Sequence, residues 1–503
     1  MEPIPIDQND RQLLERTRPA DWSNPASGQA YDLVTIGGGP AGLVAAVIAA
    51  GLGAKTALVE RYRLGGDCLH TGCVPSKALI SSAKAVQMLK KHTLYGLKNV
   101  SYEVDFTLTM ERVQDIIAKV EPHDSVARYS SLGVECHIGE AMIRSPHEVE
   151  VNGQVLTTKN IVVATGARPF VPPTPGLEDV QFSHSDNIWD LRKQPKHLAV
   201  IGGGPIGSEL ALAFRRLGSE VTIINLDPGI LPREDLDMVQ FIRDSFENDC
   251  IKLLDETTIE SIEKRGDSSR IHYSREDEKQ FLDVDHILVA VGRIPNSSGF
   301  GLENLGVELN KNKTIKVDKF LRSSIPNIYA CGDVAGPYQF THMAGHQAWY
   351  ATVNALFSPL KKFAVDYSVV PWCTYTDPEL ARVGLSEDEA KARNIPHEVT
   401  TYGLDDLDRA ITDRNDYGKV KVITPPGKDK ILGTAICGVH AGDLLAEFTL
   451  AMKHGIGLNK ILGTIHPYPT LSEASKMLAG VWRKNHAPAV VLHFLERFHS
   501  WRR

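Results

Sequence analysis

The stretch Leu33-Val-Thr-Ile-Gly-Gly-Gly-Pro-Ala-Gly42 decides the fold of this chain. Its apolar start predicts a buried strand, its glycines predict a tight turn, and the Ala- and Val-rich residues that follow predict a helix. The next apolar run, residues 56–59, predicts a second strand that ends at Glu60. A strand, a glycine turn, a helix and a strand in this order form a βαβ unit with parallel strands.

The same unit occurs a second time in the chain. Residues 197–201 predict a strand that runs into Gly202-Gly-Gly-Pro-Ile-Gly207, and a helix and a strand at 221–224 follow. Each copy is also followed by an apolar strand that closes on a glycine, at residues 161–166 and 287–292. This internal repeat predicts two related α/β domains in one chain.

Both glycine turns have the spacing that binds a dinucleotide. The first glycine permits the turn, the second lets the backbone approach a pyrophosphate, and the third lets helix and strand pack closely. The helix N-terminus then offers free N–H groups and a positive dipole to the phosphates. A single copy is a weak signal that an ordinary tight turn also gives, but two copies between a strand and a helix favour two nucleotide sites.

The two copies differ at the residue that meets the ribose. Glu60 lies 18 residues after the first turn, and a carboxylate there accepts hydrogen bonds from both ribose hydroxyls and repels a 2′-phosphate. Asn225 holds the same place after the second turn and carries no charge, so it permits either NADH or NADPH. Arg233 could reach a 2′-phosphate, and the alternative is a solvated charge beside two acids.

Two cysteines follow the first unit directly, in Gly65-Gly-Asp-Cys-Leu-His-Thr-Gly-Cys-Val-Pro-Ser-Lys77. A disulfide between Cys68 and Cys73 would close a small, accessible loop, which suits a reducible pair better than a stabilising cross-link. A zinc site needs two further close ligands, and the neighbourhood offers only His70. Two unrelated thiols are the other alternative. Lys77 either shares a helix face with Cys73 and favours its thiolate, or is a solvated helix residue.

The composition is typical of a soluble protein with several domains. The chain has 503 residues, of which 42% are hydrophobic and 23% charged. Its net charge of −7 argues against nucleic acid as a main partner. Seven scattered cysteines with one close pair, and an N-terminus unlike a signal peptide, predict a cytoplasmic location. The uncharged run 33–54 is long enough to span a bilayer, but its glycines divide it into strand, turn and helix.

Taken together, these features resemble the class I pyridine nucleotide–disulfide oxidoreductases. The cysteine segment is similar to the redox signature of that family, and Ala330-Cys-Gly-Asp333 is similar to its second FAD motif. Residues 291–296 resemble the return from its nicotinamide domain, and residues 375–384 resemble the opening of its dimer-interface domain. The resemblance covers residues 30–480 and is nearest to the mercuric-reductase-like members.

The resemblance implies an α/β fold with two Rossmann-like dinucleotide-binding domains, for FAD and NAD(P), and an α+β C-terminal dimerisation domain. It implies a homodimer whose active site is shared across subunits. The expected parts are an N-terminal extension at 1–29, an FAD-binding domain at 30–185 that continues as a central part at 291–366, an NAD(P)-binding domain at 186–290, a dimerisation domain at 367–480 and a basic amphipathic helix at 481–503.

The resemblance also implies the chemistry. Electrons pass from NADPH or NADH through FAD to the cysteine pair, in which Cys73 is nearer the flavin and Cys68 meets the substrate. Lys77 and Glu209 match positions that pair beside the flavin, although Glu209 alone would simply stabilise a helix N-terminus. The cofactor-binding positions that the resemblance implies are Gly37, Gly39, Pro40, Ala41, Gly42, Glu60, Gly66, Lys77, Gly139, Ala141, Thr165, Gly166, Gly202, Gly204, Ile206, Gly207, Asn225, Gly292, Arg293 and Asp333.

One residue departs from the pattern of the family's disulfide reductases. Those enzymes use a His from the partner subunit, placed five residues before a Glu. Here Glu473 matches that Glu, Tyr468 stands in the histidine position, and His466 is two residues early. Mercuric reductases resemble this chain in that tyrosine. They also carry two cysteines near the C-terminus, and this chain has none after Cys437.

We therefore expect Hg²⁺, another soft metal ion or a different non-disulfide compound as the acceptor. Cys68 and Cys73 would bind the substrate metal, and no structural metal site is expected. Lipoamide or another disulfide is the alternative substrate, which His466 would serve if the chain bulged at Tyr468. A flavin-binding redox sensor with poor turnover is the second alternative.

The predicted C-terminal helix has an apolar stripe beside basic residues. We favour packing of this stripe on the protein's own dimer over contact with a membrane surface. The stripe comprises Val491, Leu492, Phe494, Leu495, Phe498 and Trp501, and the basic residues are Arg497, Arg502 and Arg503.

Overall fold

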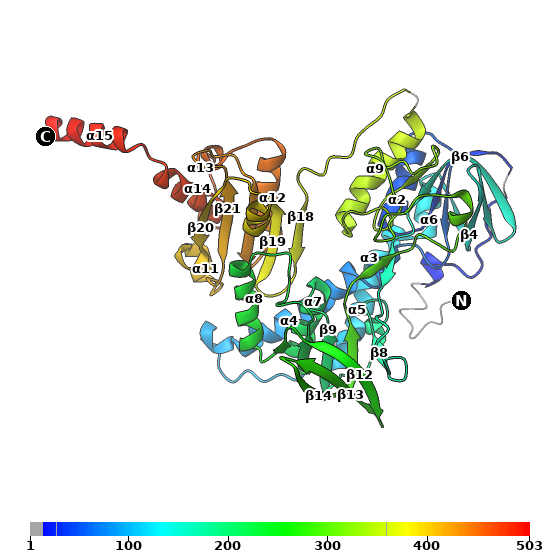
Figure 1. The fold of residues 1–503 in the computed structure, drawn as a ribbon, viewed down its shortest axis with the longest axis horizontal. Helices are drawn as coiled ribbons and strands as arrows, with labels where there is room; N and C mark the ends of the chain where they lie inside the picture. The colour runs from blue at the N-terminus through cyan, green and yellow to red at the C-terminus, as the bar shows by residue number, and fades with distance from the viewer. Residues whose placement is uncertain (1–13, 27, 359) are drawn as a thin grey trace. The chain divides into compact units, whose positions relative to one another are not determined.

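The structure, a computed structural model, describes residues 14–26, 28–358 and 360–503. It divides into two compact units (Figure 1). Unit 1 extends to Leu226 and resumes over Leu253–Val365. Unit 2 comprises Asp227–Lys252 and Asp366–Arg503, so it combines a short segment from the middle of the chain with the C-terminal part.

The first sheet of unit 1 is built on the first glycine-turn repeat. Strand β1 (Tyr31–Ile36) pairs in parallel with β2 (Thr56–Glu60) on one side and with β6 (Gln154–Val163) on the other. Helix α2 (Pro40–Gly51) connects β1 to β2, so the predicted βαβ order is confirmed. The sheet has the order β3-β2-β1-β6-β5-β4, and its remaining strands are β3 (Val134–Ile138), β4 (Ala141–Ser145), β5 (Glu148–Val151) and β17 (Ile328–Ala330), which pairs with β6.

Small residues let helix α9 (Thr341–Phe357) approach α2 closely. Alanines from both helices are buried between them, and the Thr352 hydroxyl donates a hydrogen bond to the Ala45 carbonyl oxygen at 3.3 Å. This packing places the start of α9 at the end of the sheet that carries the glycine turn. The other helices of this part are α3 (Gly66–His70), α4 (Cys73–Lys90), α5 (Phe106–Val120) and α6 (Val126–Ser131).

The described part of the predicted N-terminal extension is tied to this sheet. The Trp22 indole N–H donates to the Cys136 carbonyl oxygen at 3.2 Å. Asn24 exchanges two hydrogen bonds with the backbone of Ile138. Residues 1–13 and 27 lie outside the described residues.

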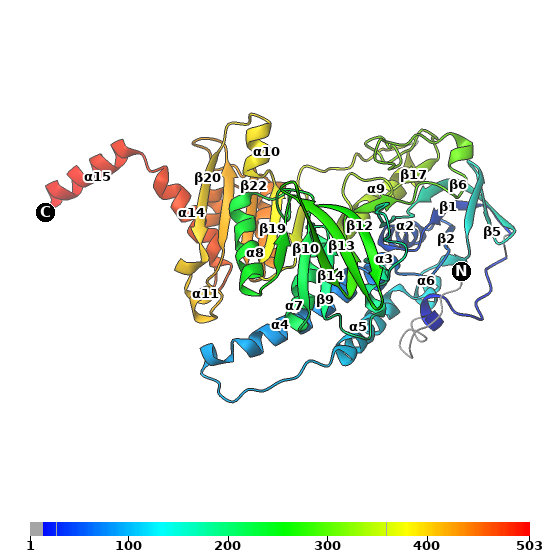
Figure 2. The same ribbon diagram turned by 60° about the horizontal axis from the view of Figure 1, so that its bottom comes forward.

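The second parallel sheet of unit 1 is built on the second repeat. Strand β9 (His197–Ile201) lies between β10 (Glu220–Ile224) and β15 (His286–Val289), and helix α7 (Pro205–Leu217) connects β9 to β10. A three-stranded antiparallel sheet shares one apolar core with this sheet, and Figure 2 shows the two sheets beside each other. The further strands are β8 (Phe182–Ser183), β11 (Lys252–Leu254), the antiparallel β12 (Thr258–Arg265), β13 (Ser268–Arg275) and β14 (Glu278–Val284), and the pair β7 (Ala167–Pro169) and β16 (Arg293–Pro295).

Unit 2 is an antiparallel sheet covered by helices, as expected of an α+β domain. Its strands have the order β18-β19-β22-β21-β20, and Phe448, Leu478 and Trp482 from the helices lie in its core. The strands are β18 (Pro371–Thr374), β19 (Glu379–Gly384), β20 (Glu398–Gly403), β21 (Lys419–Thr424) and β22 (Gly433–Gly438). The helices are α8 (Leu236–Asn248), α10 (Glu387–Ala392), α11 (Asp408–Thr412), α12 (Ala441–Lys453), α13 (Leu458–Leu462), α14 (Glu473–Asn485) and α15 (Ala489–Arg502).

The C-terminal end differs from the single helix expected over 481–503. Residues up to Asn485 complete α14, and α15 starts only at Ala489, after Pro488. A proline has no N–H for the helix ladder and restricts the residue before it, which explains the break. Among the described residues, no helix has the length and apolar content needed to cross a bilayer.

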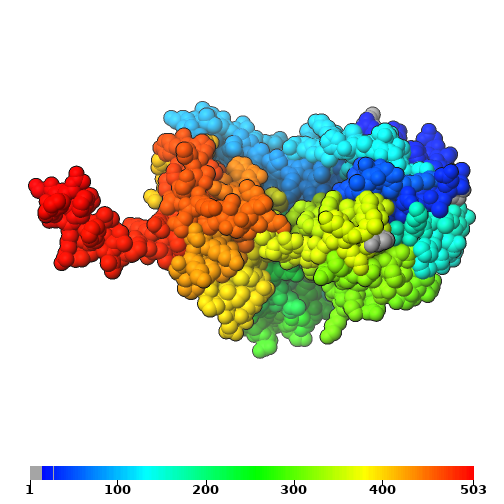
Figure 3. Space-filling model, turned by 90° about the horizontal axis from the view of Figure 1, so that it is seen from above, coloured from blue at the N-terminus to red at the C-terminus, as the bar shows by residue number. Residues whose placement is uncertain are grey.

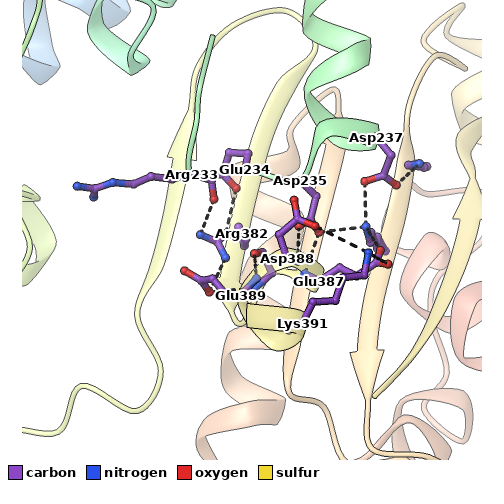
Figure 4. Close-up of polar contacts among 12 residues, drawn as sticks. Arg233, Glu234, Asp235, Asp237, Arg382, Glu387, Asp388, Glu389 and Lys391 are labelled. Carbon is purple, nitrogen blue, oxygen red and sulfur yellow. Dashed lines mark hydrogen bonds and ion pairs between the residues drawn. The ribbon is translucent and has the colours of Figure 1, made fainter. Parts of the chain in front are cut away.

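Buried ion pairs hold the segment 227–252 in unit 2, although its sequence lies within the expected NAD(P)-binding domain at 186–290. Lys421 is only 3% exposed and contacts Asp235, Asp237 and Glu387 at 2.7–3.0 Å. Figure 4 shows these acids, of which Asp235 directly precedes α8, Asp237 lies in α8, and Glu387 starts α10.

A second buried cation belongs to the same network. The Arg382 side chain is 2% exposed and forms ion pairs with Glu234 and Glu389, each at 3.0 Å. Arg382 also donates to the Arg233 carbonyl oxygen at 3.0 Å. The Arg233 side chain itself points away from the network (Figure 4), so its contact with a nucleotide phosphate stays a prediction.

Candidate active site

The two glycine turns have the same geometry, and two positions in each require glycine. Gly37 has a φ of +108°, and Gly202 has a φ of +110°. A Cβ at Gly42 would lie 1.7 Å from the Gly37 carbonyl oxygen, and a Cβ at Gly207 would lie 2.1 Å from the Gly202 carbonyl oxygen. Each helix therefore starts directly against its turn, which only glycine permits.

The middle glycine of each turn leaves space for a ligand. A Cβ at Gly204 would meet no atom within 4 Å, and one at Gly39 would meet only the Gly66 Cα, at 3.7 Å. Helices α2 and α7 both begin with a proline directly after this glycine, so their first N–H groups point toward the same space. This arrangement fits a pyrophosphate at each turn.

The residues expected to meet the two riboses are held in matching positions. The Gly38 N–H donates to Glu60 Oε2 at 2.6 Å, and the Gly203 N–H donates to Asn225 Oδ1 at 3.2 Å. Burial raises the pKa of Glu60, and its hydrogen bonds from backbone N–H groups oppose that effect. Beside Asn225 lies an acid that the sequence did not indicate, because Asn225 Nδ2 is 3.5 Å from Asp255 Oδ1.

The other expected cofactor positions follow the strands of the two parallel sheets. Thr165 and Gly166 follow β6, and Asp333 follows β17. The carboxyl ends of parallel strands meet at one edge of a sheet, where α/β proteins bind their ligands. In the first sheet this edge also holds Gly37, Gly39, Pro40, Ala41, Gly42, Glu60, Gly66 and Gly139, and in the second it holds Gly202, Gly204, Ile206, Gly207, Asn225, Gly292 and Arg293. Ala141 is instead the first residue of β4, in the antiparallel part of the first sheet.

The structure brings the two cysteines together at the junction of two helices. Cys68 lies in α3, and Cys73 is the first residue of α4. The Cys68 thiol donates a hydrogen bond to the Cys73 sulfur, which lowers the pKa of Cys73 to about 6. The same bond, together with burial, raises the pKa of Cys68. These opposite shifts favour the thiolate on Cys73 and the thiol on Cys68.

Two further groups stabilise the Cys73 thiolate. The Thr341 hydroxyl lies 3.2 Å from the Cys73 sulfur, and both it and the positive charge of Lys77 lower the pKa of Cys73. Lys77 lies one turn further along α4, as the sequence predicted. Its Nζ is 2.9 Å from Glu209 Oε2 on α7, so the expected contact between these two residues is present.

An arginine and two aspartates complete this region. Arg293 forms an ion pair with Asp67, and its Nε lies 3.8 Å from Asp333 Oδ2. Burial raises the pKa of Asp333 to about 6, although Arg293 opposes the shift. Sequence reasoning missed Asp67, which its place directly before Cys68 could have indicated. It also missed Thr341, for which the sequence holds no local signal.

The position of His70 is that of a structural residue and not that of a metal-binding side chain. Its side chain is buried, and its Nε2 lies 2.6 Å from the Leu64 carbonyl oxygen. Burial lowers its pKa to about 3, so the ring is neutral. Within the described part of the chain, no group of three or more His, Cys, Asp or Glu side chains could hold a metal ion.

The three remaining site candidates lie in unit 2, whereas the cysteine pair lies in unit 1. The Tyr468 hydroxyl donates to Asp408 Oδ2 at 2.8 Å, and the residue is 71% exposed. His466 is packed away, with Nε2 2.9 Å from Glu447 Oε1 and a side chain that is 6% exposed. Glu473 is buried and accepts a hydrogen bond from the Thr470 N–H at 3.3 Å.

Known proteins share both parts of this architecture. Residues 31–348 match the family described as pyridine nucleotide-disulphide oxidoreductase, and residues 370–479 match its dimerisation domain. A mercuric reductase of Lysinibacillus sphaericus is 33% identical over 90% of this chain and 83% of its own length. A dihydrolipoyl dehydrogenase of Chlamydia muridarum is 34% identical over 92% of this chain and 99% of its own length.

A solved structure agrees with these relatives. A cysteine-to-serine mutant of the HOCl-induced flavoprotein disulfide reductase RclA of Escherichia coli, solved as a Cu(II) complex, has a TM-score of 0.81 and 26% identity over 90% of this chain and 100% of its own. The family uses FAD and NAD(P)H, which the two glycine turns fit, and its dimerisation domain supports a homodimer. The chain therefore belongs to the pyridine nucleotide–disulphide oxidoreductase family.

Proposed function

We propose that this oxidoreductase is mercuric-reductase-like, with Hg²⁺, another soft metal ion or a different non-disulfide compound as its acceptor. The observation that carries the proposal is the tyrosine at position 468, where the family's disulfide reductases have a histidine. When bound, FAD supplies the transfer of an electron pair from a nicotinamide to the cysteines. Glu60, Asp333 and the first glycine turn would hold FAD, and Asn225 and the second turn would hold NADPH or NADH.

The proton requirement separates the two classes of acceptor. Reduction of a disulfide releases a thiolate, which calls for a proton donor whose pKa is near neutral. A histidine meets this need, because its unperturbed pKa is about 6.5. The hydrogen bond from Tyr468 to Asp408 raises the pKa of Tyr468 above its usual value, so the phenol stays protonated. Tyr468 can orient a ligand by a hydrogen bond, but it is a poor proton shuttle.

His466 is engaged elsewhere. Its Nε2 contacts Glu447, and its Nδ1 lies 3.1 Å from the Thr464 carbonyl oxygen, so both ring nitrogens have partners. Tyr468, in contrast, is exposed at the surface and is available to contact another molecule. We infer that Tyr468 serves the cysteine pair of the partner subunit, as the resemblance implies.

The cysteine pair suits a thiophilic metal ion. Cys73 is already a thiolate, and binding of a metal by Cys68 releases the one remaining proton. The metal then stabilises both thiolates and needs no external acid. The similarity to a mercuric reductase, and to a disulfide reductase solved with Cu(II), supports this acceptor class.

A disulfide reductase is the second candidate, because the similarity to a dihydrolipoyl dehydrogenase is equally high. Two variants separate the candidates: Tyr468→Phe and His466→Ala, assayed for NADPH oxidation with Hg²⁺ and with lipoamide. We expect turnover with Hg²⁺ in the natural protein, a fall of roughly tenfold or more in Tyr468→Phe, and little change in His466→Ala. Strong lipoamide turnover that is lost in His466→Ala and kept in Tyr468→Phe would overturn the proposal.

A further inference from the structure

Helix α15 is an element that nothing in the described chain covers. None of its described residues, Ala489–Arg502, is buried. Figure 1 and Figure 3 show it extending away from the rest of unit 2. Large apolar side chains on it are exposed, with Val490 at 83%, Phe494 at 66% and Trp501 at 82%. The match to the dimerisation domain ends at residue 479, so α15 lies beyond the matched part of the chain.

Most of the exposed apolar side chains of α15 lie on one face, and Leu492, which is 53% exposed, lies outside it. An α-helix turns by about 100° per residue, so residues three or four positions apart share a face. This face is made of Val490, Val491, Phe494, Leu495, Phe498 and Trp501. The opposite face carries His493, Glu496, Ser500 and Arg503 together with Leu492, while Arg497 lies at the edge of the apolar face and Arg502 lies within it.

Aromatic and basic groups meet at the end of this helix. The Phe498 and Trp501 rings have centroids 6.5 Å apart, and the Arg502 guanidinium lies 5.4 Å from the Phe498 ring centroid. Tryptophan prefers the boundary between lipid chains and headgroups, and arginine beside it can reach lipid phosphates. The side chains at this end are thus those of a helix that lies in a membrane surface.

The charge of α15 indicates the kind of surface. Three arginines, at 497, 502 and 503, face a single acid, Glu496, on a protein whose net charge is −7. A second copy of α15 would add three more arginines and supply no excess negative charge to attract them, whereas an anionic surface attracts them. The exposure and charge of α15 thus reverse the preference for dimer packing that the sequence suggested. We propose that α15 binds a membrane surface that carries anionic lipid, with its apolar face in the headgroup layer and its arginines on the lipid phosphates.

The test uses the full chain with its FAD and two kinds of vesicle, phosphatidylcholine alone and phosphatidylcholine mixed with phosphatidylglycerol. We expect the protein to float with the anionic vesicles only. A rise in ionic strength from about 0.1 M to about 1 M shortens the Debye length from about 10 Å to about 3 Å and should release it.

Two double variants test the two faces of the interaction. Arg497→Glu with Arg502→Glu should weaken the partitioning by about tenfold or more, because each basic residue near such a surface contributes about fivefold. Phe494→Asp with Trp501→Asp should abolish it. The matched control reverses two exposed charges outside α15, Arg265→Glu with Arg275→Glu, and should bind as the natural protein does.

Three results would overturn the proposal: equal flotation with both vesicle types, equal loss in the control, or no flotation at all. A fourth measurement addresses a second copy of the chain as the occupant. If light scattering showed that Phe494→Asp with Trp501→Asp turns a dimer into monomers, α15 would be a dimer contact rather than a membrane contact. NADPH oxidation should be unchanged in all of these variants.

Discussion

The Cys73 sulfur is stabilised as a thiolate from three sides. Cys68 and Thr341 supply hydrogen bonds, and Lys77 supplies a positive charge. Removal of a hydrogen bond to a charged group costs about 1.5–3 kcal/mol, and one pKa unit corresponds to about 1.4 kcal/mol. Single side chains at this site should therefore shift the thiolate's titration measurably.

The titration of Cys73 can be followed in the two-electron-reduced holoprotein. We expect a long-wavelength charge-transfer absorption from the Cys73 thiolate beside oxidised FAD. Because the pKa of Cys73 is lowered to about 6, the band should persist at neutral pH and fade as the pH falls through about 6. Cys73→Ser should lack the band, and Cys68→Ser, which cannot form the disulfide, should show it with oxidised FAD and no added reductant. A band that survives in Cys73→Ser would reassign the pair.

Thr341 allows a sharper version of this experiment. Thr341→Val keeps the shape of the side chain but removes the hydroxyl that lies 3.2 Å from the Cys73 sulfur. The midpoint of the band should then rise by roughly one pH unit, because the thiolate loses a donor. Thr341→Ser is the matched control and should keep the midpoint of the natural protein. Equal midpoints in all three proteins would show that this hydroxyl does not act on the thiolate.

At the scale of elements, comparison of the two βαβ repeats shows which features of the glycine turn depend on the residue at the ribose position. Their turns match in φ and in the close contacts of their glycines, yet Glu60 accepts a backbone hydrogen bond in one and Asn225 does so in the other. The side chain at this position can therefore be exchanged with little effect on the turn. The difference between the repeats should affect the choice of nucleotide and leave the fold unchanged.

Coenzyme preference tests this exchange. We expect the natural protein to accept NADPH with weak discrimination against NADH. Asn225→Glu adds the carboxylate that repels a 2′-phosphate, so the ratio of kcat/KM for NADH over NADPH should rise by about tenfold or more. Asp255→Asn is the companion variant, because Asp255 lies beside Asn225 and its charge should disfavour NADPH slightly. An unchanged ratio in Asn225→Glu would show that this position does not meet the ribose.

At the scale of the whole molecule, stability depends on cations that are buried among acids. Lys421 is 3% exposed and pairs with three carboxylates, whereas Lys419 is 21% exposed and, among the described residues, forms an ion pair with Asp237 only. Removal of one member of a buried network leaves unpaired buried charge, which costs about 3–5 kcal/mol. Lys421→Met should therefore lower the free energy of unfolding of unit 2 by that order, and the control Lys419→Met should cost about 1 kcal/mol or less.

The same network predicts a dependence on pH. Burial raises the pKa of Asp235, but backbone N–H groups of Glu387 and Asp388 and the Lys421 ammonium together hold it below its usual value. The pKa values of Asp237 and Glu387 are also lowered. Carboxylates with depressed pKa values stabilise the fold above the unfolded pKa of about 4 and lose that effect as the pH falls. Thermal unfolding should show this acid loss in the natural protein and a smaller one in Lys421→Met.

The sequence could predict features whose physical requirement is local. Gly37 and Gly42 lie within six residues of each other, and Cys68 and Cys73 follow the first repeat directly. Their spacing in the sequence was therefore enough to predict the turn and the cysteine pair. It could not predict contacts that depend on distant residues. Thr341 meets Cys73 across 268 positions, and helix α8 joins unit 2 through Lys421 rather than through its neighbours in the sequence. Sequence spacing also could not show that α15 is uncovered, because exposure is a property of the folded surface.

Because unit 2 is built from two separate segments of the chain, it cannot fold completely until the second segment has been synthesised. Asp237 is synthesised 184 residues before its partner Lys421. At a synthesis rate of about 5–20 residues per second, about 10–40 s pass between the synthesis of α8 and that of Lys421, which neutralises its carboxylates. During that interval the second parallel sheet of unit 1 can form, while α8, which is acidic and has one apolar face, remains exposed to solvent. In a nascent chain that is halted before residue 421, α8 should therefore be accessible to proteases or chaperones. Once synthesis of the chain is completed, α8 should pack in unit 2 and lose this accessibility.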